Sequence, residues 1–411
     1  MEEQKYPIME THRAMTFQFF NPGRKRVLLR GPVLTQSGYG VHARQVARWL
    51  LSREDVDLSV QALPWGDTPW LINPDLCDGL VGKLMTKTVD PQGTKFDISV
   101  QLQLPNEWDS KLAGVNIGIT AGVETDKCNP EWIHACNTMN HVVVPSNHTA
   151  NCFKETGEVK SSLDVIPESY MDSLDQMLPT KIDDLEFSTP FNFLMVGQIT
   201  GNNPENDRKN LFYAIKWFCE TFSKDNSVGL VIKTNAGRNT DIDRAGVLDL
   251  FRKLLGEVRK GPFPKIHLIH GDLTDHEVTS LYRHNQIKAF LAPTRGEGYG
   301  LPILEAAVAG LPVIATGWSG HMDFLQHGKF IKLEYKLSEV HSSRIDNKIF
   351  MKGNRWANPI ESDFKKKLEK FRSSPTVPKE WALDLSKSLV PLYSQESIQK
   401  KYNEILGKYF T

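Results

Sequence analysis

The sequence has no excess charge of either sign and few cysteines. Lysine plus arginine and aspartate plus glutamate number 49 each among 411 residues. The chain therefore lacks the bulk positive field that binding to nucleic acid or to an anionic membrane leaves in composition. The five cysteines are odd in number and form no C-x-x-C pair, which argues against a disulfide framework or a structural zinc site. A reducing compartment fits this cysteine content.

Long apolar runs are absent as well. No stretch approaches the roughly 18 apolar residues of a membrane span, and the opening MEEQKYPIMETHRAMTF lacks the apolar core of a signal peptide. The sequence also shows no basic amphipathic helix that would hold the chain on a membrane. We therefore expect a cytoplasmic protein whose membrane contact is at most peripheral.

What the chain does contain is two series of short hydrophobic runs that alternate with amphipathic segments. Alternating strands and helices indicate parallel sheets that are covered on both faces. Helical spacing appears between the runs, for example in GVHARQVARWLL, RKNLFYAIKWFCETF and LPILEAAVAG. The strand-like runs lie at residues 26–31, 56–63, 96–102, 115–122 and 141–146 in the first series, and at 191–198, 228–235, 265–271, 289–294 and 311–317 in the second.

A polar stretch with little periodicity, Ser169 to Pro190, separates the two series. We expect a first Rossmann-like domain on the acceptor side over residues 1–182, a second, ligand-binding one over 183–375, and closing helices over 376–411 that pack back toward the first domain. Two such domains agree with a prior of ~150 residues per domain. Doubly wound sheets that lie side by side share a crevice at their strand ends, where ligands of such sheets bind.

The segment TRGEGYGLPILEAAVAGLPVIATG, which begins at Thr294, places Glu297 after a strand and Glu305 one turn into the following helix. The glycines between them let the backbone approach a ligand closely. Pro302 suits the first helical turn, whose free N–H groups favour a phosphate. Carboxylates accept hydrogen bonds from hydroxyl groups and so can hold a vicinal diol such as that of a ribose. The pattern indicates a site for a sugar that carries phosphate.

This combination resembles the E-x7-E motif of the retaining glycosyltransferases of family 4, which have the GT-B architecture. That architecture is α/β, with two facing Rossmann-like domains, a cleft between them and a C-terminal helix that closes back. Further segments are similar to family signatures: GPVLTQSGYGVHARQVARWL, VVVPSNHTANCFKETG, VIPESY and RKNLFYAIKWF. The resemblance covers most of residues 26–406.

The resemblance implies a glycosyltransferase that moves a hexose-type sugar from a UDP- or GDP-sugar to an acceptor hydroxyl with retention. The leaving diphosphate would take the acceptor proton, so neither a metal nor another cofactor is expected. Glu297 would contact the donor sugar, Glu305 would bind the ribose, and Lys209 would neutralise the diphosphate. The other donor-binding residues that the resemblance implies are Arg208, Gly298, Tyr299, Gly300, Leu301, Gly38 and Gly40.

The chain departs from the family pattern at two positions. The family often has an arginine after the glycine of its VGR strand end, whereas this chain has Gln198, followed by the insertion ITGNNPEND. Lys233, at the end of LVIKT, is the substitute cation that we expect. The family also commonly has a histidine near the reaction centre. In the comparable segment ITAGVETDKCNPEW we expect Glu124 to orient the substrate or to act as the acceptor base.

Other interpretations stay open at this point. A nucleotide-sugar epimerase of the same architecture and a scaffold that binds a nucleotide sugar without turnover are the two alternatives. The D-x-D triplets at residues 55–57 and 241–243 lie in ordinary charged sequence and fit chance better than a metal site. The sequence does not predict the identity of the acceptor: a glycan, a lipid-linked sugar, a protein, a small metabolite and a modified base in DNA all remain candidates.

Overall fold

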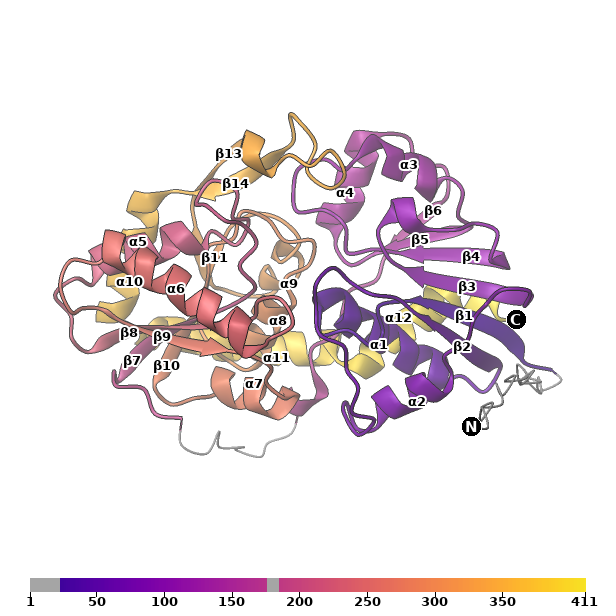
Figure 1. Ribbon diagram of the computed structural model, residues 1–411, viewed down its shortest axis with the longest axis horizontal. Coiled ribbons are helices and arrows are strands. Elements are labelled where there is room, and N and C mark those ends of the chain that lie inside the picture. The colour runs from indigo at the N-terminus through magenta and orange to yellow at the C-terminus, as the bar shows by residue number, and fades with distance from the viewer. Residues whose placement is uncertain (1–22, 176–184) are drawn as a thin grey trace, which may run out of the picture.

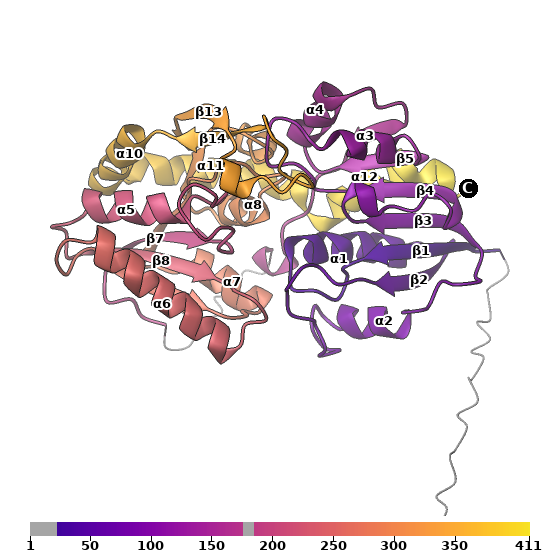
Figure 2. The same cartoon turned by 45° about the horizontal axis from the view of Figure 1, so that its top comes forward.

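The computed structural model describes residues 23–175 and 185–411, which form two α/β domains side by side (Figure 1). Each domain has a six-stranded sheet, and every strand pair in these sheets is parallel. Figure 2 shows the two sheets next to each other from a second direction. The predicted α/β class with two Rossmann-like sheets is confirmed.

The first sheet carries its helices on both faces. Its strands, in spatial order, are β2 (Val56–Ala62), β1 (Lys25–Gly31), β3 (Phe96–Leu102), β4 (Ala113–Ile119), β5 (His141–Val144) and β6 (Ser162–Val165). Its helices are α1 (Gly38–Leu51), α2 (Leu80–Thr86), α3 (Pro130–Cys136) and α4 (Asn147–Thr156), with the 3-10 turns η1 (Pro105–Glu107) and η2 (Asp172–Leu174). The closing helix predicted at the end of the chain, α12 (Gln395–Leu406), buries Ile398, Tyr402 and Leu406 in this domain's core.

The second sheet is built in the same way. Its strands, in spatial order, are β12 (Ile331–Leu333), β11 (Val313–Thr316), β10 (Ile287–Ala292), β7 (Phe191–Val196), β8 (Val228–Thr234) and β9 (Lys265–His270). The helices are α5 (Leu211–Thr221), α6 (Asp241–Val258), α7 (Asp275–Tyr282), α8 (Leu301–Val308), α9 (Met322–Leu325), α10 (Glu361–Ser373) and α11 (Thr376–Tyr393). The chain ends in a short turn, η4 (Gly407–Tyr409).

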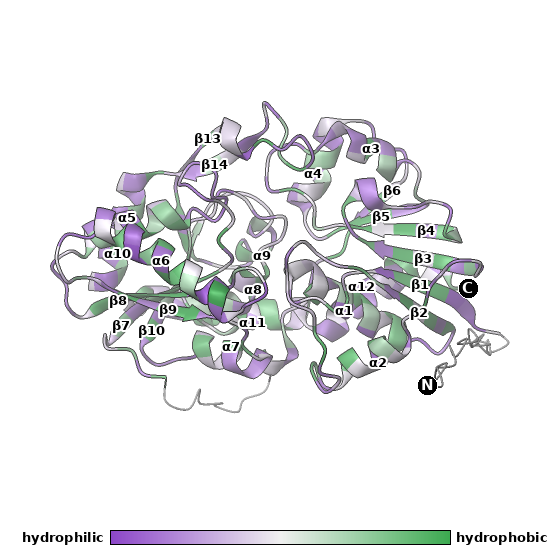
Figure 3. Ribbon diagram, viewed as in Figure 1, coloured by the Kyte–Doolittle hydropathy of each residue, from purple (hydrophilic) through white to green (hydrophobic). Residues whose placement is uncertain are grey.

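The strands are hydrophobic because both faces of each sheet are covered. In β1, Val27, Leu28 and Leu29 are all fully buried, although they point alternately to opposite faces. Figure 3 shows hydrophobic residues concentrated in the strands of both sheets and in the helix faces beside them. This two-sided burial is what gave the continuous apolar runs of the sequence.

The order of strands places a ligand crevice at a defined point of the second sheet. From β7 the chain proceeds outward to β8 and β9, and then returns to add β10 on the other side of β7. The loops that follow β7 and β10 therefore leave the sheet in opposite directions, and the gap between them is a topological switch point. These loops carry Lys209 and Glu297, respectively.

The chain passes between the domains twice, after β6 and between α11 and α12 (Figure 1). The two crossings lie against each other. The backbone N–H of Tyr170 donates to the carbonyl of Tyr393 (3.2 Å), and the Ser169 hydroxyl donates to the Gln395 side chain (2.8 Å). The Gln45 amide of α1 donates to the Ser169 carbonyl (2.7 Å). The crossings thus form a single hydrogen-bonded hinge.

An antiparallel hairpin extends from the second domain beside the cleft. Residues 334–360, called the clasp below, contain β13 (Tyr335–Glu339), the 3-10 turn η3 (Ser342–Arg344) and β14 (Arg355–Pro359). The backbone N–H of Ile360 donates to the Glu334 carbonyl (2.9 Å) and closes the base of the clasp. Part of the predicted separating stretch, residues 176–184, lies outside the described residues.

Candidate functional site

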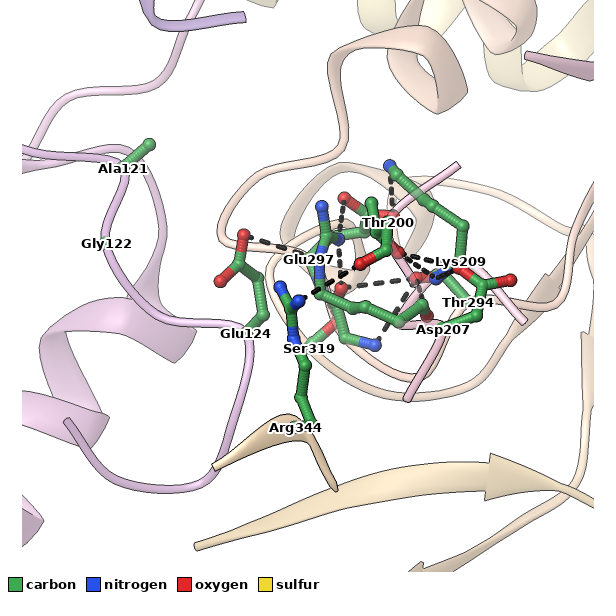
Figure 4. A network of polar contacts seen from close by, with 12 residues as sticks. Ala121, Gly122, Glu124, Thr200, Asp207, Lys209, Thr294, Glu297, Ser319 and Arg344 are labelled. Carbon is green, nitrogen blue, oxygen red and sulfur yellow. Dashed lines mark hydrogen bonds and ion pairs between the residues drawn. The ribbon is translucent and has the colours of Figure 1, made fainter. Parts of the chain in front are cut away.

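Four charged side chains predicted from the sequence meet at the switch point. The Lys209 ammonium donates to one Glu297 carboxylate oxygen (2.7 Å) and the Arg208 guanidinium donates to the other (3.0 Å). The Arg208 Nε also lies 3.5 Å from the Glu124 carboxylate, which comes from the first domain. Figure 4 shows this network, with Glu124 facing the side chains of the second domain. The network joins the two domains through alternating charges.

The loop between β7 and α5 is held in place by backbone contacts. The buried Asp207 carboxylate accepts from the backbone N–H groups of Leu211 (2.5 Å) and Lys209 (3.2 Å), which fixes the start of α5. The Arg295 guanidinium donates to the Asp207 carbonyl (3.1 Å), and the Arg295 N–H donates to the Arg208 carbonyl (2.9 Å). The loop after β10 therefore fixes the loop that carries the two cations.

Glu297 is an anion in this arrangement. Burial raises its pKa, but the charges of Lys209 and Arg208 and the hydrogen bond from Lys209 outweigh burial and hold the pKa at about 2. Burial lowers the pKa of Lys209, and Glu297 opposes that effect. Burial also acts to lower the pKa of Arg208, but Glu124 and Glu297 raise it overall. Glu297 can accept hydrogen bonds from sugar hydroxyls but cannot serve as an acid near neutral pH.

The glycine loop after β10 touches the first domain directly. A Cβ atom on Gly298 would lie 2.1 Å from the Ala121 carbonyl oxygen, and one on Gly296 would lie 2.0 Å from the Glu124 carbonyl oxygen. The Ser146 hydroxyl, at the N-cap of α4, donates to the Gly298 carbonyl (2.7 Å). The absence of side chains at these glycines allows the backbones of the two domains to meet.

Glu305 lies on α8, deeper in the second domain. Its carboxyl is buried and accepts a hydrogen bond from the Tyr282 hydroxyl (3.2 Å). Burial raises the pKa of Glu305 well above its usual range, and the charge of Asp275 raises it further. The Tyr282 hydroxyl and the burial of α8 thus fix the Glu305 carboxyl inside the second domain.

The start of α8 borders a pocket at the switch point. Gly300 is the N-cap with φ +97°, a left-handed conformation that favours glycine, and Pro302 occupies the first turn. The first N–H groups of a helix attract anions. The pocket is lined by residues of β7, β10 and α8 and the loops beside them, among them Gly197, Gln198, Lys209, Thr294, Glu297, Gly300 and Pro302.

The remaining predicted loop residues serve several structural purposes. The buried Tyr299 donates its hydroxyl to the Glu168 carbonyl (2.8 Å). Leu301, the first residue of α8, packs against the second domain's core. Gly40 is buried, and a Cβ there would lie 2.2 Å from the Thr35 carbonyl oxygen, so its own loop requires glycine. Gly38 is exposed at the start of α1.

Lys233 is not part of the charge network. Its ammonium donates to Asn235 (2.5 Å) at the end of β8. Burial lowers the pKa of Lys233 to about 8, and the main opposing charge is Asp272. Among residues 23–175 and 185–411, no contact joins Lys233 to Glu297 or Arg208. The structure thus places the expected substitute cation elsewhere along the sheet edge.

Two side chains beside the network were missed at the sequence level. The Ser319 hydroxyl accepts from the backbone N–H of Glu297 (2.9 Å), and Ser319 itself has φ +89°. Arg344 of the clasp reaches the loop after β7, where its guanidinium donates to the Thr200 carbonyl (3.0 Å). Neither residue belongs to a periodic segment or a motif, so no sequence signal marked it.

A buried polar cluster lies next to the hinge. The His42 ring of α1 is 3.8 Å from the Glu168 carboxyl and 3.3 Å from the Tyr402 hydroxyl of α12. Burial raises the pKa of Glu168 to about 8 and lowers the pKa of His42 to about 3. Both side chains are therefore neutral at pH 7, so the 3.8 Å approach of His42 to Glu168 is not an ion pair, and the hydrogen bond of this cluster is the one between His42 and Tyr402.

Because of this cluster, we expect the unfolding free energy of the protein to fall between pH 6.5 and 8. The native pKa of Glu168, about 8, lies above its unfolded value of about 4.5. Between these two pH values the native protein keeps a proton on Glu168 that the unfolded chain has lost, so the unfolding free energy falls as pH rises toward 8. Between pH 6.5 and 8, wild type is expected to lose roughly 2 kcal/mol of unfolding free energy relative to Glu168→Gln. Urea unfolding at both pH values measures the difference. The exposed control Glu396→Gln should follow wild type, and parallel curves for wild type and Glu168→Gln would contradict the prediction.

Comparison with known proteins places this site in a wider context. Residues 249–336, which include the glycine loop and α8, match the sequence model of the glycosyl transferases group 1. A sucrose synthase of Melioribacter roseus is 27% identical over 163 residues, covering 36% of this chain and 20% of that protein. A 2-deoxystreptamine N-acetyl-D-glucosaminyltransferase of Niallia circulans is 39% identical over 54 residues, covering 13% of this chain and 14% of that protein. The matches thus span about a fifth of the first relative and about a seventh of the second.

Solved structures share the whole architecture. The Anabaena protein HepE, in complex with UDP and glucose, has a TM-score of 0.63 at 11% identity, covering 94% of this chain and 100% of that one. Sucrose-phosphate synthase from Thermosynechococcus elongatus has a TM-score of 0.58 at 11% identity, covering 94% and 99%. At such identities the likeness concerns the fold, which is GT-B. In the described part of the chain, no helix has the length and apolar character needed to cross a membrane.

Proposed function

We propose that the chain is a retaining glycosyltransferase that moves a hexose-type sugar from a nucleotide-diphosphate sugar to an acceptor hydroxyl without a metal. The observation that carries this proposal is the buried Glu297 anion held by Lys209 and Arg208 beside the N-terminus of α8. An anion that accepts sugar hydroxyls thus lies next to cations and helix N–H groups that can hold phosphate. A nucleotide sugar presents both of these chemical groups.

In this proposal the donor lies along the edge of the second sheet. Its ribose reaches Glu305, its diphosphate lies at Lys209 and the start of α8, and its sugar lies at Glu297. Breaking the bond between the sugar and the diphosphate moves negative charge onto the diphosphate. Fixed cations and helix N–H groups stabilise that charge more strongly in the transition state than in the bound donor.

The acceptor approaches from the first domain. Its hydroxyl attacks the anomeric carbon on the face that the diphosphate leaves, and its proton passes to a diphosphate oxygen. The new bond then has the configuration of the old one. Glu124, tied to Arg208, lies on the acceptor side and orients the incoming sugar. The cations supply the neutralising charge that a metal would otherwise provide.

A UDP-sugar is the first donor to test. HepE was solved with UDP and glucose, and the same fold surrounds the cleft here. An epimerase would change the sugar without passing it to an acceptor, and a binding scaffold would hold the nucleotide sugar without releasing nucleoside diphosphate. The experiment below separates these outcomes from transfer.

The decisive experiment measures nucleoside-diphosphate release from a panel of UDP-, GDP- and ADP-sugars, with and without chelator. We expect slow release from one donor, insensitive to chelator, and a fall of roughly 10²- to 10³-fold in Lys209→Met because the leaving charge loses its cation. Lys216→Met on α5 is the matched control, since that lysine is half-exposed and pairs with Glu220 at 3.5 Å, far from any residue given a role in the reaction. Release that chelator abolishes would overturn metal independence. Nucleotide binding without release in any condition would favour the scaffold.

A further inference from the structure

The clasp holds the loop that carries Glu124. Its Asn354 side chain donates to the Thr125 hydroxyl (3.2 Å) and the Lys127 carbonyl (2.7 Å). The backbones of Arg355 and Asp126 are also joined: Asp126 N–H donates to the Arg355 carbonyl (2.9 Å), and Arg355 N–H donates to the Asp126 carboxylate (2.7 Å). The clasp therefore belongs to the second domain but is fastened to the first beside the site.

Arg344 extends from the clasp toward the same site. Its guanidinium stacks over the Phe350 ring at 4.4 Å and donates through one terminal nitrogen to the Thr200 carbonyl (3.0 Å). Its Nε is buried and has no hydrogen-bond partner among the described residues. Figure 4 shows the guanidinium pointing into the region between Glu124 and the loop after β7. An Arg side chain is thus held in position with donor groups unused.

Arg344 has no carboxylate at ion-pair distance among the described residues, although three lie nearby. Arg208 repels it, and the nearby carboxylates are Glu124, Asp346 and Asp207. Glu124 pairs with Arg208, Asp346 accepts from three backbone N–H groups of its own loop, and Asp207 fixes the start of α5. Within residues 23–175 and 185–411, Arg344 forms no ion pair of its own. Desolvation lowers the pKa of Arg344, so part of its hydration is already lost.

The position of Arg344 points to the sugar end of the cleft. The contacts run from Glu297 through Arg208 to Glu124, and the Arg344 guanidinium faces the region between Glu124 and the loop after β7 (Figure 4). The pocket at the start of α8 is lined by Lys209 and Glu297 but not by Arg344. A diphosphate bound in that pocket would therefore not be the partner of Arg344.

We propose that Arg344 binds a carboxylate or phosphate group carried by one of the two sugars that react, either the transferred one or the acceptor. This inference rests on the proposed function. A guanidinium offers a fork of N–H donors that matches a carboxylate or phosphate, and a neutral hydroxyl would not balance its charge. The substrate class is therefore an acidic or phosphorylated sugar.

The test compares charged and neutral sugars in two arms. The donor arm measures nucleoside-diphosphate release from UDP-glucuronate and UDP-glucose, and the acceptor arm measures transfer to glucose 6-phosphate and glucose. Wild type should prefer the charged member in one arm by roughly 10- to 100-fold in kcat/KM, and Arg344→Gln should lose that preference while retaining its rate with the neutral member. Arg344→Lys should recover part of it. The arm that shows the preference identifies which sugar carries the charge.

Two controls separate the possible failures. Arg238→Gln removes an exposed arginine that bridges the domains through Asp67 (3.2 Å) and should leave the preference intact. Calorimetric binding of glucose 6-phosphate with saturating UDP needs no turnover. If wild type releases no nucleoside diphosphate but binds glucose 6-phosphate through Arg344, the proposed function fails and the anion site stands. Equal losses with charged and neutral sugars in Arg344→Gln, or a neutral preference in wild type in both arms, would overturn the anion site.

Discussion

Glu297→Gln is expected to lower turnover by roughly 10²- to 10³-fold and to reduce the unfolding free energy by about 3–5 kcal/mol. Glutamine nearly preserves the shape of the side chain but removes its charge. The partly buried Lys209 ammonium, now 2.7 Å from a carboxylate oxygen, would then face a neutral amide. Arg208 would keep Glu124 as a partner. The stability loss therefore comes mainly from one uncompensated cation.

A double variant distinguishes the two effects. Glu297→Gln combined with Lys209→Met removes both members of the pair, so much of the lost stability should return while turnover stays low. Urea unfolding and donor hydrolysis measure the two quantities on the same samples. Glu220→Gln on α5 removes a half-exposed carboxylate that pairs with Lys365 (2.6 Å) and should change stability by less than about 1 kcal/mol. Wild-type turnover in Glu297→Gln would remove Glu297 from the proposed mechanism.

Gly298→Ala is expected to lower turnover by roughly 10²-fold or more with little effect on the folding of either domain. Its added methyl group would lie 2.1 Å from the backbone carbonyl oxygen of Ala121, and a backbone atom cannot swing away as a side chain can. Gly298 does not have a positive φ, so close approach rather than strain sets the requirement. The domains would stay apart by a fraction of an ångström to an ångström, enough to misplace the acceptor.

The measurement separates closure from donor binding. UDP binding, which uses the second domain, should persist in Gly298→Ala, while transfer falls. Gly246→Ala on α6 is the matched control, since a Cβ there meets nothing within 4 Å. That control should gain about 0.5–1 kcal/mol of stability and keep its turnover. Undiminished transfer in Gly298→Ala would show that the observed contact is not needed for the reaction.

Much of the fold could be predicted because its strands are buried on both faces. Each predicted strand-like run overlaps a strand of one of the two sheets. The missed strands β6 and β12 are short and lie at sheet edges, where no long apolar run is needed. Helix α6 was not predicted, although its apolar residues Val247, Phe251, Leu254 and Val258 recur at helical spacing.

The site was predictable to the extent that motif residues lie on loops at one sheet edge. Glu297, Lys209, Arg208 and Glu124 meet because strand ends converge there, although their roles stay predictions. Lys233 lies near the end of β8 at that edge, and the direction of its side chain depends on packing that a sequence pattern does not encode. Arg344 arrives through the clasp, whose polar, irregular residues carry no period.

The neighbouring crossings between the domains have a mechanical consequence. Because the two passages of the chain are hydrogen-bonded to each other at Tyr170 and Tyr393, a rotation of one domain against the other would take place about this single hinge. The clasp contacts the first domain on the other side of the cleft (Figure 1). A small rotation about the hinge would therefore produce a large displacement at the clasp. Opening would withdraw Asn354 and Arg355 from the first domain, and would carry Arg344 away from Glu124 in the same movement. The contacts that hold the two domains together and the residue proposed to bind the charged sugar thus lie on the same hairpin and move together.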